Sequence, residues 1–234
     1  MTRKMLLDKV SSDYVENGIN TYLNPYSYHI IRGRKDIVEG VDSFLVDGGA
    51  LKVIINRLMC RDIKRKSFDM TSMANEIFTL CVKQKKTIYF IGSNQKIIEL
   101  FVSNVKRRFV GIQVAGYSHG YCVGEDRCNV VEEVASKKID YVICGMGTPR
   151  QEEFLIDLKC QGWNGTGFTC GGFFHQSSKA MDYYPPVFNR LKLRWLYRCI
   201  DEPRLITRYL IKYPVAFFFI IKDIFSLKMM RNDR

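Results

Sequence analysis

An aspartate and two glycines follow a short apolar run, in the order Phe44–Val46, Asp47, Gly48 and Gly49. If the run is a strand, Asp47 stands at its end over a cleft, and the glycines let backbone or substrate come close. A carboxylate in that place can accept a proton from a hydroxyl nucleophile or bind a sugar hydroxyl. An ordinary Asp-Gly turn has the same local sequence, so both interpretations stay open at this point.

A second glycine loop follows the apolar run Thr87–Ile91. Gly92 is followed by Ser93, a candidate N-cap residue, and then by a helical pattern. Free amides at the start of that helix could bind a phosphate or a ribose oxygen. A plain strand-to-helix turn has the same pattern.

A third loop contains Gly145 and Gly147 and is more specific. Thr148 is predicted as the N-cap residue, Pro149 as the first helical residue, and Gln151 as the partner that completes a capping box. The glycines remove side chains from the approach to the helix, whose unpaired amides and positive dipole end favour an anion. A well-capped turn without a ligand is the alternative.

The familiar cofactor motifs are not present in the sequence. There is neither a P-loop nor a complete G-x-G-x-x-G, so ATP and NAD are weak candidates. His29, His119 and His175 do not have metal-ligand spacing, and no D-x-D pair follows a predicted strand. We therefore expect no metal and no cofactor, with arginines and helix ends neutralising any phosphate leaving group.

Strand-like runs and amphipathic stretches alternate along the chain. This order predicts an α/β fold, a Rossmann-like, mostly parallel sheet with helices on both faces, and ligands beyond the carboxyl ends of its strands. The predicted strands are Gly18–Leu23, Ser43–Val46, Thr87–Ile91, Ile112–Ala115, Tyr141–Cys144 and Gly167–Cys170. The predicted helices are Gly49–Met59, Thr71–Gln84, Asn94–Arg108, Arg127–Ser136 and Pro149–Lys159.

The composition changes after about Tyr184, where Pro185-Pro186 indicates a boundary. Residues 190–234 contain eleven Lys and Arg against four Asp and Glu, and they are rich in aromatic residues. We therefore expect a Rossmann-like core over residues 1–184 and a basic, aromatic, helical appendage over residues 185–234.

Charge and hydropathy bound the partners and the compartment. The 234 residues include 36 Lys and Arg against 24 Asp and Glu, a net charge of +12 that suggests an anionic partner. The apolar run Val215–Ile221 is far shorter than the roughly 18–20 residues of a membrane span. The N-terminus has no secretory signal pattern, so we expect a cytoplasmic protein. The eight cysteines form no C-x-x-C pair, which argues against a zinc ribbon or a redox motif.

Several motifs occur in one order along the chain, and together they resemble the WecG/TagA/CpsF family, family twenty-six of the glycosyltransferases. The resemblance runs from about Asn20 to about Tyr209. The matching pieces are Leu23-Asn24, Asp47-Gly48-Gly49, His119-Gly120-Tyr121, Gly145–Glu152, Gly171–Phe174, Leu193–Arg198, Glu202–Arg204 and Arg208-Tyr209. The G-x-G-x-P-[KR]-Q-E and L-x-W-x-x-R…E-P-x-R blocks are each specific.

The resemblance implies a metal-independent, inverting glycosyltransferase of bacterial cell-surface polysaccharide synthesis. Members typically move N-acetylmannosamine, its uronic acid or a related hexose from a UDP-sugar. The usual acceptor is a polyprenyl-diphosphate-linked sugar, here expected to be undecaprenyl-diphosphate GlcNAc. The products enter teichoic acid linkage units, enterobacterial common antigen or capsule-type polysaccharides. The protein is expected to lie peripherally on the inner face of the cell membrane.

The resemblance also implies residue roles. Asp47 would be the general base, and Asn24 and Gln151 would hold sugar hydroxyls. Two positions depart from the family pattern, with Tyr22 in place of the usual Thr and His175 in place of a common Asp. The other residues expected in the substrate cleft are Gly48, Gly49, Gly92, His119, Tyr121, Gly145 and Gly147.

The arginines of the tail have two expected roles. Arg190, Arg194 and Arg198 have the spacing of one helix face, and Arg204 and Arg208 repeat it. Their guanidinium groups could bind the lipid diphosphate or the departing UDP. Aromatic and aliphatic residues between them are typical of an interfacial helix, so an anionic membrane surface is an expected partner.

Other classes of function were weighed against this one. A dehydrogenase would need further glycines after Gly92. The charge suits a nucleic-acid binder, but the positive residues gather beside an apolar run and no RNA-binding motif appears, so no nucleic acid is expected. The alternative is a non-catalytic or nucleotide-binding Rossmann protein of the same fold. Exposed apolar tails often associate, which makes a homo-oligomer a further candidate.

Overall fold

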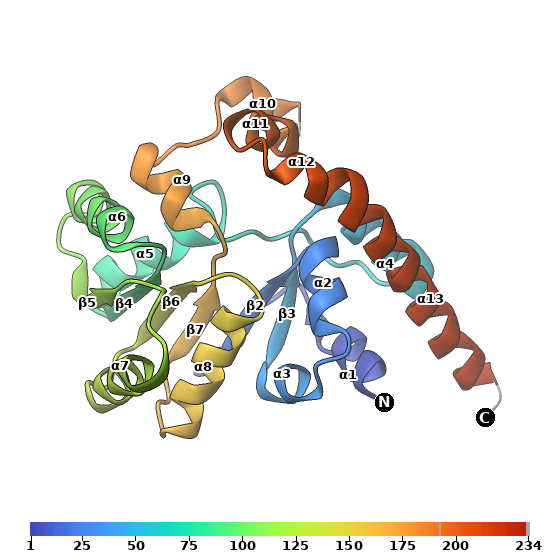
Figure 1. Ribbon diagram of the computed structural model, residues 1–234, viewed down its shortest axis with the longest axis horizontal. Coiled ribbons are helices and arrows are strands. Elements are labelled where there is room, and N and C mark those ends of the chain that lie inside the picture. The colour runs from blue at the N-terminus through green and yellow to red at the C-terminus, as the bar shows by residue number, and fades with distance from the viewer. Residues whose placement is uncertain (192, 233–234) are drawn as a thin grey trace.

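Seven strands form one parallel sheet (Figure 1), seen in a computed structural model that describes residues 1–191 and 193–232. Their order across the sheet is β1-β3-β2-β7-β6-β4-β5, and every neighbouring pair is parallel. The carboxyl ends of the strands therefore meet at one edge, where ligands of such folds bind. The strands are β1 (Val10–Ser11), β2 (Ile19–Leu23), β3 (Ser43–Val46), β4 (Thr87–Gly92), β5 (Gln113–Ser118), β6 (Tyr141–Gly145) and β7 (Thr166–Thr169).

Helices cover both faces of the sheet, so the predicted α/β, Rossmann-like fold class is confirmed (Figure 1). One face of the sheet, here called the first face, is covered by α1 (Thr2–Asp8), α2 (Pro25–Ile31), α3 (Lys35–Gly40), α4 (Gly49–Met59), α7 (Gly124–Ser136) and α8 (Arg150–Cys160). The other face, here called the second face, is covered by α5 (Met73–Gln84), α6 (Gln95–Arg108) and α9 (Phe173–Lys179).

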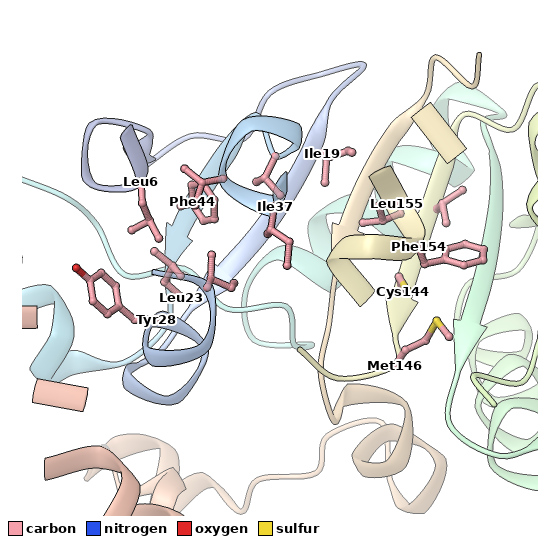
Figure 2. Close-up of a cluster of buried hydrophobic side chains, with 14 of the residues drawn as sticks. Leu6, Ile19, Leu23, Tyr28, Ile37, Phe44, Cys144, Met146, Phe154 and Leu155 are labelled. Carbon is pink, nitrogen blue, oxygen red and sulfur yellow. The ribbon is translucent and has the colours of Figure 1, made fainter. Parts of the chain in front are cut away.

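The strands feed both cores because successive side chains point to opposite faces of a sheet. In β4, Tyr89 and Ile91 belong to the first-face cluster, whereas Ile88 and Phe90 belong to the second. Figure 2 shows the first-face cluster, in which Leu23 and Phe44 of neighbouring strands meet helical side chains. Strands β3, β4 and β6 are buried on both faces and are mostly apolar, as is usual in parallel sheets. Strands β2 and β7 are also buried but contain buried polar residues, among them Thr21 and Thr169.

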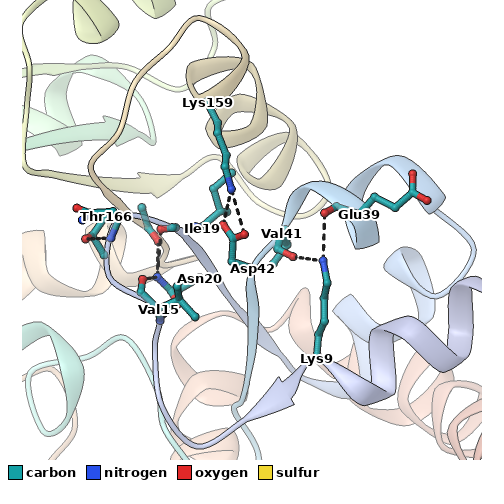
Figure 3. Close-up of polar contacts among 12 residues, drawn as sticks. Lys9, Val15, Ile19, Asn20, Glu39, Val41, Asp42, Lys159 and Thr166 are labelled. Atoms are coloured by element: carbon teal, nitrogen blue, oxygen red, sulfur yellow. Dashed lines mark hydrogen bonds and ion pairs between the residues drawn. The ribbon is translucent and has the colours of Figure 1, made fainter.

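Polar contacts tie the opposite, amino-terminal edge of the sheet (Figure 3). The Asp42 carboxylate accepts hydrogen bonds from the Ile19 amide at 2.8 Å and from Lys159 Nζ at 2.8 Å. Lys9 Nζ donates to the carbonyl oxygens of Val38 and Val41, near the end of α3. These contacts hold together the start of β2, the chain segment that precedes β3 and the end of α8.

The C-terminal segment crosses the carboxyl edge and then returns along the first half of the fold. Its last helix lies against α2 and α4 (Figure 1). Ile220 and Ile224 are buried in the first-face cluster, so this helix is part of the main core. None of the described helices is both long and apolar enough to cross a bilayer. The segment consists of α10 (Pro186–Arg190), α11 (Arg194–Asp201), α12 (Leu205–Thr207), the π-helical turn η1 (Arg208–Lys212) and α13 (Tyr213–Asn232).

Three local predictions were wrong. Asn94 caps α6, with its Oδ1 accepting from the Ile97 amide at 2.9 Å, so Ser93 is not the N-cap residue. Helix α8 has Pro149 at its N-cap position and no side-chain cap, because the Thr148 hydroxyl donates to Glu152 instead. Arg190 ends α10 while α11 begins at Arg194, so Arg190 does not share one helix face with the arginines of α11.

The buried carboxylate of Asp223 fastens α13 to α2. It accepts two hydrogen bonds from Arg32, at 2.8 and 2.6 Å, and one from the Tyr28 hydroxyl at 3.0 Å. The Asp223 side chain is fully buried and that of Arg32 is 12% exposed. Burial and the neighbouring Asp223 raise the pKa of Tyr28, which keeps its hydroxyl protonated as a donor.

We expect the substitution Asp223→Asn to lower the free energy of unfolding by about 3 kcal/mol, because it leaves a buried guanidinium without its counter-charge. The matched control is Asp182→Asn, which breaks the exposed pair with Arg108 and is expected to cost at most about 1 kcal/mol. Urea unfolding followed by circular dichroism measures both. Equal losses in the two variants would contradict the assignment of Asp223 as the anchor of α13.

Candidate functional site

A cavity of about 460 Å³ opens at the carboxyl edge of the sheet, under the C-terminal segment. Its walls come from the loops that follow β2, β3, β6 and β7, together with side chains of α11, α12 and η1. The predicted residues that line it are Asn24, Asp47, Tyr121, Gly145, Gly147, Gln151, Arg198, Arg204 and Arg208. The fold thus brings residues from the first half of the chain and from its C-terminal segment together around one cavity.

Asp47 extends from the end of β3 into this cavity. Its amide donates to the Leu23 carbonyl at 2.7 Å, which continues the pairing of β3 with β2 beyond the last strand residue. Its side chain is 37% exposed, and Oδ1 accepts from Arg65 Nη2 at 3.1 Å. Desolvation by the surrounding protein raises the pKa of the Asp47 carboxyl, and Arg65 opposes that rise. A carboxylate with a raised pKa that faces an open cavity is suited to accept a proton.

Two arginines of the C-terminal segment bring positive charge to the same cavity. Arg198 donates through Nη2 to Glu202 at 3.4 Å, and its side chain is 22% exposed. Arg208 lies over the ring of Tyr26 at 4.0 Å and donates to Asn24 Oδ1 at 3.3 Å. In both arginines the Nε atom is buried and has no hydrogen-bond partner among the described residues. Because buried donors are nearly always paired in native proteins, these two indicate a ligand.

Arg194 and Arg204 have different surroundings. Arg194 does not line the cavity, because its donors are taken by Asp69 at 3.0 Å, Thr71 at 2.6 Å and Asn189 at 2.7 Å. It clamps α11 to the loop before α5, so the structure places it outside the lining of this cavity. Arg204 lies at the mouth of the cavity, 79% exposed, and is held by Glu202 Oε2 at 3.0 Å.

Three of the expected glycines stand outside the lining for identifiable reasons. Gly92 packs against β6, where a Cβ atom would come within 2.5 Å of the Gly145 carbonyl oxygen, so it permits close approach of two strands. Gly48 has φ of +124°, which lets the chain turn into α4, and Gly49 is the first residue of that helix. These positions shape the edge of the site and do not face the cavity.

The expected H-G-Y block is only partly in the site. The Tyr121 side chain is 62% exposed at the rim. His119 does not line the cavity, since it lies on the surface with Nδ1 accepting from the Tyr121 amide at 3.2 Å. Its ring therefore shapes the loop that carries Tyr121.

Gln151 is positioned by a buried polar network. Its Nε2 donates to Glu152 Oε1 at 3.0 Å, and its Oε1 accepts from the Gly171 amide at 3.2 Å. The same Glu152 oxygen accepts from Thr21 at 2.7 Å and from Thr148 at 3.2 Å. Burial raises the pKa of Glu152, and the hydrogen bonds to its oxygen oppose this. The network joins β2, α8 and the loop after β7, and so fixes the floor of the cavity.

Sequence reasoning missed several residues of the cavity. Asp69, Tyr26 and Tyr184 line it and were not predicted. Asp69 lies 22 positions after Asp47 in an irregular segment, where no periodicity signals a site. Tyr22 and His175 also line the cavity. Both were noticed in the sequence only because they depart from the family pattern.

Within the described part of the chain, no three His, Cys, Asp or Glu side chains come together in a way that could hold a metal ion. The positive charge available to an anion in the cavity is that of Arg198, Arg204 and Arg208. Desolvated guanidinium groups bind phosphate strongly, because they offer several donors in a fixed plane.

Comparison with known proteins decides the family. The protein-family model described as "Glycosyl transferase WecG/TagA/CpsF family" matches residues 5–229 of this chain. The chain belongs to this family. The resemblance inferred from the motifs is thereby confirmed, and so is the expectation that the protein is a glycosyltransferase.

The relatives name two donor sugars. A "UDP-Gal:alpha-D-GlcNAc-diphosphoundecaprenol beta-1,4-galactosyltransferase" of Shigella boydii is 37% identical over 198 residues, 84% of this chain and 83% of that protein. An "N-acetylglucosaminyldiphosphoundecaprenol N-acetyl-beta-D-mannosaminyltransferase" of Bacillus subtilis is 27% identical over 205 residues, 84% of this chain and 78% of that protein. The enzyme of the same name from Bacillus spizizenii is 28% identical over 170 residues, 71% and 63% of the two chains.

Proposed function

We propose that this glycosyltransferase moves a hexose from a UDP-sugar to undecaprenyl-diphosphate GlcNAc, with inversion at the anomeric carbon. The observation that carries the proposal is one cavity lined both by the Asp47 carboxylate and by two half-buried arginines, Arg198 and Arg208, whose buried Nε atoms have no partner among the described residues. Both named groups of relatives act on a GlcNAc-diphosphoundecaprenol acceptor. A proton acceptor and arginines that can bind a diphosphate, lying in one cavity, are what such a transfer needs.

In the proposed reaction, Asp47 accepts the proton of the acceptor hydroxyl. The hydroxyl oxygen forms a bond to the anomeric carbon from the face opposite UDP, and the bond from that carbon to the diphosphate oxygen breaks. UDP leaves with the electron pair of the broken bond. Arg198 and Arg208 neutralise the negative charge that develops on it, so the proposed mechanism is metal-independent and uses no cofactor. Asn24 and Gln151 hold sugar hydroxyls.

The donor is proposed to be a UDP-hexose, with UDP-galactose ahead of UDP-N-acetylmannosamine. Typical family members gave the expectation of N-acetylmannosamine. The galactosyltransferase shares 37% identity with this chain, against 27–28% for the two Bacillus N-acetylmannosaminyltransferases. That difference favours galactose as the sugar that the cavity accepts.

The substitution Asp47→Asn should reduce kcat by at least roughly 100-fold, because the amide cannot accept the proton. Transfer from UDP-galactose to a short-chain polyprenyl-diphosphate GlcNAc measures it, with and without EDTA. The matched control is Asp62→Asn, an exposed aspartate outside the cavity, and both it and EDTA should leave turnover unchanged. Full turnover by Asp47→Asn, or loss of turnover in EDTA, would contradict the mechanism.

The pH profile reports the charge of Asp47. The carboxylate is the active form, so kcat/KM should fall as the pH drops through its pKa, which burial raises above the ordinary 3.8. Arg65 lowers that pKa, so Arg65→Gln should move the acid limb to higher pH. Lys64→Gln removes a neighbouring exposed charge and should leave the limb in place. A limb that stays fixed or moves to lower pH in Arg65→Gln would exclude Asp47 as the base.

We further propose that the C-terminal segment holds the protein on an anionic membrane surface, where its lipid-linked acceptor lies. Most of the exposed large apolar side chains among the described residues belong to residues 187–229, including Leu210 at 71% and Phe218 at 63% exposure. Exposed lysines, Lys212 and Lys222, lie beside them. Apolar insertion together with cations near anionic head groups gives reversible binding.

Replacing both Leu210 and Phe218 by Glu should reduce binding to vesicles that contain phosphatidylglycerol by at least about 10-fold, since it removes apolar area and adds repulsion. Flotation of the full chain with vesicles measures binding. Val110→Glu is the control. Val110 is an 81% exposed apolar residue in the loop between α6 and β5, outside the C-terminal segment. If the double variant binds vesicles like the wild type, the membrane proposal fails. A smaller oligomer in solution for that variant would then assign the surface to contact with a second copy.

A further inference from the structure

The hydroxyl of Tyr22 is buried in the candidate site without a hydrogen-bond partner. Tyr22 lies on β2, its side chain lines the cavity, and the residue is 8% exposed. Its Oη is one of four buried side-chain polar atoms that have no partner among the described residues. Three of the four, this hydroxyl and the Nε atoms of Arg198 and Arg208, belong to residues of one cavity. Such a group costs free energy unless a ligand satisfies it.

Packing and strand pairing hold the ring in place. Tyr22 pairs with Leu45 of β3, and its backbone amide donates to Thr169 Oγ1 of β7 at 3.3 Å. The rings of Tyr22 and Phe68 pack in a T-shaped arrangement, with their centroids 6.1 Å apart, and both belong to the second-face cluster. None of these contacts uses the hydroxyl. Ring packing and strand pairing therefore fix the direction of the phenol, and its O–H stays available to a ligand.

The surroundings of Tyr22 favour an uncharged partner. Asp47 and Asp69 line the same cavity, and after burial their charges are the main causes that raise the pKa of Tyr22. The phenol therefore remains protonated and offers a donor. Carboxylates repel a phosphate, so a neutral, hydroxyl-bearing sugar suits the surroundings of Tyr22 better than the diphosphate does.

We propose that the Tyr22 hydroxyl donates a hydrogen bond to one ring hydroxyl of a reacting hexose, and that this contact makes Tyr22 a specificity-determining residue. This inference rests on the proposed glycosyl transfer. A site built to bind a substrate hydroxyl rejects the analogue that lacks it, because the buried protein group is then left unpaired. Donor and acceptor sugars offer the same chemistry, and the experiment separates them.

The test compares the wild type with Tyr22→Phe, which keeps the ring and removes the oxygen. Each enzyme is assayed with UDP-galactose and its monodeoxy analogues, and with short-chain polyprenyl-diphosphate GlcNAc and its monodeoxy analogues. The matched control is Tyr89→Phe, a buried tyrosine of β4 that lies outside the cavity and whose hydroxyl is 2.6 Å from Ser118 Oγ. Melting temperatures are measured without ligand.

In the wild type, one analogue should lose about 10- to 100-fold in kcat/KM, the loss expected for one hydrogen bond that leaves a buried group unpaired. In Tyr22→Phe the same analogue and its parent should react within about 2-fold of each other. The analogue concerned, donor or acceptor, identifies the sugar. Tyr89→Phe should keep the wild-type discrimination. The melting temperature of Tyr22→Phe should equal or exceed that of the wild type, because no protein hydrogen bond is lost.

A Tyr22→Phe variant that discriminates like the wild type, or that slows every substrate pair equally, would overturn the assignment and leave the proposed function standing. A lower melting temperature without a change in discrimination would assign the hydroxyl to the fold. A wild type that transfers no hexose from any UDP-sugar would remove the proposed function and, with it, this inference.

Discussion

The hold of α13 on α2 through the buried Asp223 carboxylate is the contact on which the site depends. Asn24 is the N-cap residue of α2, and its side chain also accepts a hydrogen bond from Arg208. The same C-terminal segment carries Arg198 and is clamped to the first half of the chain by Arg194 and Asp69. Fixing α13 therefore helps to hold Arg198 and Arg208 in the cavity that Asp47 also lines. The strands of the sheet pair with one another, so we expect this attachment to matter more for the arginines of the cavity than for strand pairing.

The cavity combines carboxylates and guanidinium groups, as the proposed transfer requires. Asp47, Asp69, Arg198 and Arg208 all line it. In the proposed reaction the diphosphate of the donor meets the arginines, and the sugar lies near Asp47 and Tyr22. Among the described residues, the incompletely paired atoms of this cavity are the Nε atoms of the two arginines and the hydroxyl of Tyr22. The free protein thus holds unpaired donors that a bound UDP-sugar would satisfy.

Much of the fold could be predicted because apolar periodicity sets it directly. The six predicted strands match β2 to β7 to within a few residues at each end, and the predicted helix Gly49–Met59 is α4. β1 was missed because two residues, Val10–Ser11, are too few to show a period. Residues at strand ends, such as Asp47, were accessible to the same reasoning. Asp69 and the clamp role of Arg194 were not, because they depend on contacts across more than 120 positions of the chain. The helix caps at Asn94 and Pro149 were misassigned because neighbouring residues offer alternative local hydrogen bonds. Asn94 accepts from the Ile97 amide, and Thr148 donates to the Glu152 side chain.

The central claim is that the unpaired donors of this cavity are completed by a UDP-sugar lying across it. A crystal structure of the full chain with UDP-galactose bound tests it most directly. The account predicts diphosphate oxygens within hydrogen-bond distance of Arg198 and Arg208, and the anomeric carbon on the side of Asp47. A nucleotide bound elsewhere, with both Nε atoms still unpaired and the Asp47 carboxylate remote from the sugar, would contradict it.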